Sequence, residues 1–201
     1  MLRDGLGHDQ GVTRGRLEAF SDGVIAIIIT IMVLELRPPH DTDVRSLWPL
    51  VPVLLRYAMS FVYIGIYWSN HHHLLQAAER VNGKILWANL HLLFWLSLIP
   101  FGTAWLGERG GSWPTALYGT ILFMAGVAYR ILERALVVHH GAHSTLAAAV
   151  GHDVKAMASV VGYVAAVAFA FVKPVVSDAL YVGIALVWFI PDRRIERAMR
   201  R

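Results

Sequence analysis

The chain has 201 residues, 56% of them hydrophobic and only 16% charged, and a formal net charge of +4 at pH 7. Soluble domains are about 45–50% apolar and about 25% charged, so this composition disfavours a soluble protein. The absence of cysteine excludes disulfides and cysteine–metal sites.

The apolar residues fall in long blocks that are separated by short polar clusters. A block of about 18–20 apolar residues is long enough to cross the hydrocarbon core of a bilayer as a helix. We therefore predict an all-α, polytopic membrane protein with a single six-helix domain over residues 1–201. The six spans are expected at about 17–36, 47–69, 84–106, 113–138, 154–172 and 175–190.

The first span ends at Pro38–Pro39, because proline cannot continue a helix. A long polar stretch precedes it, and no small-residue cleavage site follows it, so we expect this helix to be retained rather than removed as a signal peptide. At about 100° per residue, one side of the helix carries a stripe about 100° wide. This stripe consists of Gly23, Ile27, Thr30, Ile31 and Leu34.

A carboxylate, Asp22, also enters this first span. A charge at membrane depth costs a few kcal/mol, so it usually faces protein or water and has a partner. Asp22 falls on the side of the helix away from the stripe. If the stripe faces a pore, Asp22 faces the interior of its own subunit.

The second and third spans offer polar partners for Asp22. The second span ends in Trp68–Ser69–Asn70–His71–His72–His73, and Asn89 and His91 lie a turn or two into the third. A histidine beside a buried carboxylate can carry a charge or donate a hydrogen bond. Three consecutive histidines point about 100° apart and cannot converge on one ion, so we expect a polar cap and no metal site.

The later spans carry less information. Pro100 lies toward the end of the third span, Lys173–Pro174 separate the fifth from the sixth, and Pro191 closes the sixth. Arg56, inside the second span, either reaches the outer interface or pairs internally, and the sequence leaves both options open.

Six spans put both termini on one side of the membrane, and the distribution of basic residues indicates which side. Most of the 18 Lys and Arg residues lie in the N-terminal arm, the loops after the second and fourth spans, and the C-terminal tail. We therefore expect cytoplasmic termini in a bacterial plasma membrane. Basic residues at helix ends suit a lipid surface better than nucleic acid. Those expected on the cytoplasmic side are Arg3, Arg14, Arg16, Arg80, Lys84, Arg130, Arg134, Lys155, Arg193, Arg194, Arg197, Arg200 and Arg201.

The segment with Arg16, Phe20, Ser21 and Asp22 has the spacing Arg-x-x-x-Phe-Ser-Asp. It resembles the signature of the transmembrane protein 175 family of endolysosomal potassium channels and their bacterial relatives. The continuation through Thr30 to Leu36, the pair His71–His72 and the six-helix count fit the same family. The resemblance implies a homotetramer, a pore lined by the first helices, and passage of potassium and other monovalent cations.

The resemblance also implies roles for individual residues. Ile27 matches the family's hydrophobic constriction, Thr30 matches a hydroxyl layer one turn outward, and Ile31 and Leu34 match further apolar layers. Arg16, Phe20, Ser21 and Asp22 match the motif that holds the helix, with His71, His72, Asn89 and His91 as its expected neighbours. Ala26 departs from the serine of the animal channels, which implies weaker potassium selectivity.

The sequence also bears on how a channel would block ions and on two other functional classes. The sequence has no Thr-Val-Gly-Tyr-Gly filter, but a ring of isoleucines gates by excluding water when it is narrow. A secondary transporter is the main alternative, and it would show inverted repeats and helices broken near the midplane. A metalloenzyme needs about three convergent ligands, and no span contains a His-x-x-x-His pattern. We therefore expect no catalytic residue and no cofactor.

Overall fold

The computed structural model describes residues 13–141 and 154–189 of the chain. Over these ranges all regular secondary structure is helical, and a helix lies at each of the six predicted spans, which confirms the all-α fold class. The predicted basic residues at position 3 and from 193 to 201 lie outside the described residues. The helices are α1 (Arg14–Ile31), η1 (Met32–Glu35), η2 (Val44–Leu50), α2 (Val51–Gln76), α3 (Gly83–Ser97), α4 (Ile99–Arg109), α5 (Ser112–His140), α7 (Val154–Phe169) and α8 (Pro174–Phe189).

The described helices differ in apolar length. Three helical segments are long and apolar enough to cross a membrane, namely Arg14–Glu35, Val44–Gln76 and Gly83–Arg109. α7 and α8 are apolar but have 16 residues each. α5 has 29 residues, and its second half carries Arg130, Glu133 and Arg134. The three long apolar segments identify the chain as a membrane protein.

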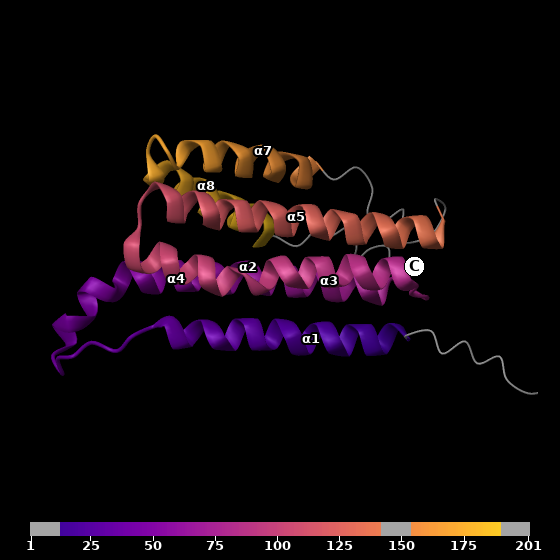
Figure 1. Ribbon diagram of the computed structural model, residues 1–201, viewed down its shortest axis with the longest axis horizontal. Helices are drawn as coiled ribbons and strands as arrows, with labels where there is room; N and C mark the ends of the chain where they lie inside the picture. The colour runs from indigo at the N-terminus through magenta and orange to yellow at the C-terminus, as the bar shows by residue number, and fades with distance from the viewer. Residues whose placement is uncertain (1–12, 142–153, 190–201) are drawn as a thin grey trace, which may run out of the picture.

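α1 is an edge helix of the bundle. Figure 1 shows it along the lower side of the molecule, with α5, α7 and α8 above. It packs on α2 and α3, whereas α5 packs on α3, α4, α7 and α8. Leu17, Ile25, Ile28 and Met32 of this segment are buried against its neighbours. One side of α1 is therefore covered by its own chain and the other is not.

The third predicted span differs from a single helix. It consists of α3 and α4, which meet at Leu98. Pro100 causes the break, because it has no amide hydrogen and its ring clashes with the carbonyl group four residues earlier. Pro100 therefore acts inside this segment rather than toward its end, and the two short helices together have the length of one span.

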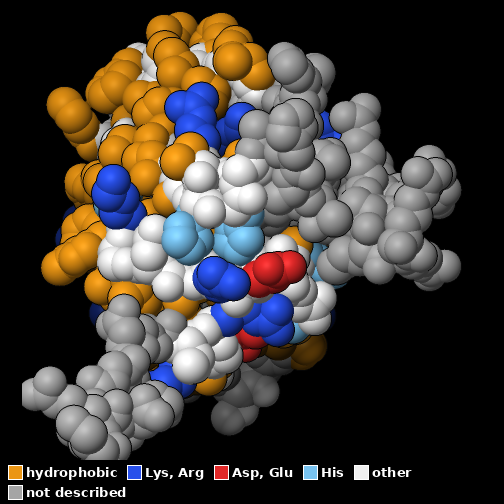
Figure 2. Space-filling view, turned by 90° about the vertical axis from the view of Figure 1, so that its right-hand side faces the viewer, with side chains coloured by type: hydrophobic (Ala, Val, Ile, Leu, Met, Phe, Trp, Pro, Cys, Tyr) orange, Lys and Arg blue, Asp and Glu red, His pale blue; other side chains and the backbone are white. Residues whose placement is uncertain are grey.

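The second helix is longer than predicted. α2 continues to Gln76, beyond the predicted end at about residue 69, and His71, His72 and His73 lie within its last turns. At this end of the bundle α1 and α3 begin, and α2 and α5 end. Basic and histidine side chains gather there, over a surface that Figure 2 shows in blue and pale blue.

Candidate functional site

The stripe predicted on α1 lies on the uncovered side of the helix. Ile27 is 60% exposed and Leu34 is 77% exposed, whereas Ile25 is 1% exposed. Gly23, Thr30 and Ile31 are exposed as well. The stripe residues therefore point away from the other helices of their own chain, and no part of the described chain covers them.

Thr30 presents an oxygen atom on this stripe. Its Oγ1 lies 3.0 Å from the carbonyl oxygens of both Ala26 and Ile27. A hydroxyl has one hydrogen and two acceptor lone pairs. The hydrogen is donated to the backbone of the same helix. The two lone pairs of the hydroxyl therefore stay available on the exposed side, where they can accept a hydrogen bond or contact a cation.

The opposite side of α1 is fixed by a chain of three buried side chains, which we call the Ser21 anchor: Ser21, Asn89 and His71. Ser21 donates from Oγ to the carbonyl oxygen of Leu17 at 2.8 Å, and accepts from Nδ2 of Asn89 at 2.9 Å. Oδ1 of Asn89 lies 2.7 Å from Nε2 of His71. Since an amide oxygen only accepts, His71 carries its proton on Nε2. The anchor thus joins α1, α3 and α2.

Asp22 does not belong to the Ser21 anchor. It is half-buried, and its Oδ1 accepts a hydrogen bond from the indole Nε1 of Trp68 at 3.0 Å. The sequence interpretation placed Asp22 among polar groups of the second and third spans, and Trp68 is one of the partners expected there. Asn89, another of them, bonds to Ser21 instead. The reason is geometric, because the 100° step between Ser21 and Asp22 turns only the former toward α3.

His72 and His91 have separate surroundings. Nδ1 of His72 lies 3.0 Å from Oε1 of Glu18. His91 accepts a hydrogen bond from Nε1 of Trp95 at 3.0 Å and lines an open groove between α3 and α5, so the structure does not bring it to Asp22. Arg16 and Phe20 are exposed and take no part in the bonds just described.

Arg14 anchors the start of α1, and the sequence analysis did not identify this role. Its Nη1 donates to the carbonyl oxygens of Gln76 at 3.2 Å and Ala78 at 3.1 Å. These carbonyls belong to the C-terminal end of α2, where the helix dipole favours a positive charge. The partners are backbone groups more than 60 positions away, so no local pattern signals the contact.

The position of Arg56 is settled by an ion pair. Its Nη2 lies 3.8 Å from Oδ2 of Asp178 on α8, and both side chains are about one third exposed or less. Arg56 therefore pairs internally, which was one of the two options left open by the sequence.

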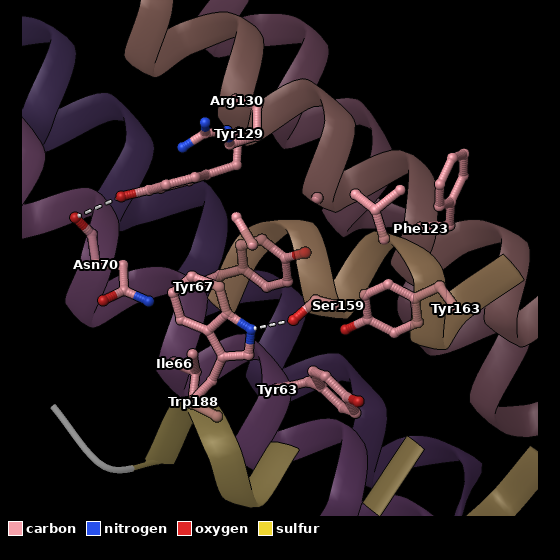
Figure 3. Close-up of a pocket in the computed structure, with 13 residues that line it drawn as sticks. Tyr63, Ile66, Tyr67, Asn70, Phe123, Tyr129, Arg130, Ser159, Tyr163 and Trp188 are labelled. Atoms are coloured by element: carbon pink, nitrogen blue, oxygen red, sulfur yellow. Dashed lines mark hydrogen bonds between the residues drawn. The ribbon is translucent and has the colours of Figure 1, made fainter. Parts of the chain in front are cut away.

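A small cavity lies among α2, α5, α7 and α8, away from α1. Its volume is about 60 Å³, and aromatic side chains make up much of its wall. Figure 3 shows Trp188 donating to Oγ of Ser159 and Tyr129 donating to the carbonyl oxygen of Asn70, at 2.8 and 3.2 Å. A space that holds a few water molecules at most is a poor route for a hydrated ion through one subunit.

Most of the chain is similar to known proteins. The family described as endosomal/lysosomal potassium channel TMEM175 matches residues 16–100, which contain the stripe and the Ser21 anchor. A potassium channel of Chryseobacterium sp. (strain P1-3) is 50% identical over 190 residues, which are 94% of this chain and 99% of that channel. The chain belongs to the TMEM175 family.

A solved structure and an animal relative extend the comparison within the TMEM175 family. The crystal structure of a lysosomal potassium-selective channel TMEM175 homolog from Chamaesiphon minutus superposes with a TM-score of 0.74, at 27% identity, over 88% of this chain and 96% of that chain. The endosomal/lysosomal proton channel TMEM175 of Danio rerio is 28% identical over 140 residues, but these are only 26% of its length. The TMEM175 fold is thus shared over nearly the full chain with a bacterial member.

Proposed function

We propose that this protein is a potassium-permeable cation channel whose pore is lined by α1 helices from four copies of the chain. The observation that carries the proposal is the exposure of the stripe with Ile27 at its centre, on a helix whose other side is fixed by buried hydrogen bonds. A relative that is 50% identical over 94% of this chain is named a potassium channel. The similar solved structure is described as potassium-selective.

Four copies are proposed because one chain offers one such stripe. A pore needs a ring of stripes, and identical subunits make such rings through closed cyclic symmetry. The family resemblance supports a homotetramer. The exposed apolar side chains of α1 would then face the axis and the neighbouring copies instead of water.

The gate in this proposal is the ring of Ile27 side chains. A narrow apolar ring excludes water and thereby blocks ions. Thr30 lies about 4.5 Å further along the helix axis, and its outward lone pairs would supply oxygen ligands beside the constriction. Ile31 and Leu34 would add apolar layers toward the far end. The Ser21 anchor and Arg14 would hold the back of α1 on the bundle.

The orientation of the protein in the membrane is inferred from the distribution of its basic residues. The end of the bundle that is rich in Arg, Lys and His side chains would face the cytoplasm, in keeping with the positive-inside tendency. Both termini would lie on that side of a bacterial plasma membrane. The permeant species would be potassium and other monovalent cations, with membrane lipid around the tetramer and neither a cofactor nor an enzymatic reaction.

Current recordings from purified protein in planar bilayers, with potassium and sodium on opposite sides, test this proposal. We expect channel currents whose reversal potential shows a preference for potassium. Saturating flux coupled to a proton gradient would support a transporter instead. The relatives that are named proton channels match over about a quarter of their length, so proton current alone, without potassium current, would contradict the proposal.

A further inference from the structure

Beside the Ser21 anchor, three potential metal ligands converge from two helices. Glu18 and Asp22 are four residues apart on α1 and so lie one above the other on the same side. His72 approaches from α2. A ligand atom from each of the three lies within 4.8 Å of the other two. Nδ1 of His72 is 3.0 Å from Oε1 of Glu18.

Neighbouring groups fix the orientation of these ligands. The indole Nε1 of Trp68 donates to one carboxylate oxygen of Asp22 at 3.0 Å. Nε2 of His72 lies 2.8 Å from the side-chain amide nitrogen of Gln76. The ring of Trp68 stacks on the imidazole of His72, with centroids 6.0 Å apart and planes 21° apart. Hydrogen bonds from outside the ligand set are the feature that orients ligands in metal sites.

We propose that Glu18, Asp22 and His72 form a binding site for a divalent zinc-type cation that bridges α1 and α2. One imidazole nitrogen and two carboxylate oxygens are ligands that Zn²⁺ accepts, at about 2.0–2.2 Å each. Ligand atoms at that distance in tetrahedral geometry lie about 3.4 Å apart. The present 3.0 Å contact is close to this value, and no other pair exceeds 4.8 Å, so each pair of ligand atoms has to move by about 1.4 Å at most. Water would fill the fourth position.

Gln76 gives the site a mechanism for accepting the ion. As the atoms lie, the amide nitrogen of Gln76 donates to Nε2 of His72, so Nδ1 carries the proton. Nδ1 lies 3.0 Å from Oε1 of Glu18 but makes no hydrogen bond to it. Metal binding needs a lone pair on Nδ1. The proton of Nδ1 leaves to solvent as Nε2 takes one up, and the Gln76 amide turns so that its oxygen accepts from Nε2.

The site is separate from the proposed pore. Glu18 and Asp22 fall about 180° and 140° around α1 from Ile27. The three residues are half-buried, with 18% of the Glu18 side chain and 34% of the His72 side chain exposed, so an ion can reach them from the polar end of the bundle. A bound ion would thus tie the first turns of α1 to α2 without touching the stripe.

Isothermal titration of the purified full-length protein with zinc chloride tests the site. We expect one ion per chain in the wild type, and affinity at least about tenfold weaker in Glu18→Gln and in His72→Gln. His73→Gln is the matched control, because Nδ1 of His73 lies 2.7 Å from the carbonyl oxygen of Ser69 instead. Its zinc affinity should equal that of the wild type.

Thermal unfolding gives a second measurement that does not depend on conduction. Zinc should raise the unfolding temperature of the wild type and of His73→Gln, and raise it much less in Glu18→Gln and His72→Gln. Equal zinc affinity and equal thermal shifts in all four proteins would overturn the proposal. Because neither measurement involves current, this result is distinct from any failure of the channel proposal.

Discussion

Asn89 of α3 donates a hydrogen bond from Nδ2 to Oγ of Ser21 on α1 over 2.9 Å, and neither side chain is exposed. The hydrocarbon core of a membrane holds no water that could replace this bond, so its loss would leave the buried amide of Asn89 without a hydrogen-bond acceptor. The contact explains how an edge helix with an uncovered side keeps one orientation relative to α2 and α3.

Ser21→Ala should therefore destabilise the protein. The change removes the acceptor for Asn89, and an unpaired buried donor costs about 1–3 kcal/mol. Thermal unfolding in detergent measures the effect. Ser97→Ala is the control, because Ser97 is exposed and its Oγ donates only to the carbonyl oxygen of Phe94 in its own helix. Equal stability of the two variants would contradict a stabilising role of the Ser21 anchor.

Asp22→Ala should cost less than Ser21→Ala. Asp22 is half-buried and accepts one described hydrogen bond, from Trp68. We expect a loss of about 1 kcal/mol, and Trp68→Phe, which removes the same bond from the other side, should give a similar loss. Measured unfolding temperatures compare the two. A far larger loss in Asp22→Ala than in Trp68→Phe would show that the carboxylate has a more important partner.

Arg14→Gln should loosen the first turns of α1. The guanidinium bonds to the carbonyl oxygens of Gln76 and Ala78 would be lost. Hydrogen exchange of the backbone amides in residues 14–20 should become faster, because local opening limits exchange at helix ends. Arg16→Gln removes an exposed arginine from the same helix and should leave exchange unchanged. Similar exchange in both variants would contradict this role of Arg14.

Native mass spectrometry should find four copies of the chain in one particle. The exposed apolar side chains of α1, among them Ile27, Ile31 and Leu34, lose their exposure when the stripes of several copies meet at an axis. A protein that is monomeric under conditions that preserve its fold would contradict a pore formed between subunits.

The sequence predicts the helices and the stripe well, because both depend on local features. Apolar length places the spans, Pro38–Pro39 ends the first one, and the 100° step of the helix separates Ile27 from Ile25. The structure has Ile27 exposed and Ile25 buried, as that step requires. The break at Leu98 was also within reach of local reasoning, because Pro100 lies mid-segment and removes a backbone hydrogen bond.

The contacts between helices were less predictable. Which of Ser21 and Asp22 meets Asn89 depends on how far α1 is rotated against α3, and sequence spacing does not give that angle. The pairing of Arg56 with Asp178 depends in the same way on the packing of α2 against α8. One feature of the sequence could have indicated the cluster around Glu18. Its spacing of four residues from Asp22 places two carboxylates on one side of the helix.

The central claim is that Ile27 of α1 forms the gate of a potassium-permeable pore, and Ile27→Asn in planar bilayer recordings tests it most directly. An amide in the ring should wet the constriction. Val161→Asn is the matched control, because Val161 of α7 is 63% exposed, close to the 60% of Ile27, but lies on another helix. We predict larger currents and weaker discrimination against sodium in Ile27→Asn, and wild-type behaviour in Val161→Asn. If Ile27→Asn leaves both conductance and selectivity unchanged, α1 does not form the gate and the account is wrong.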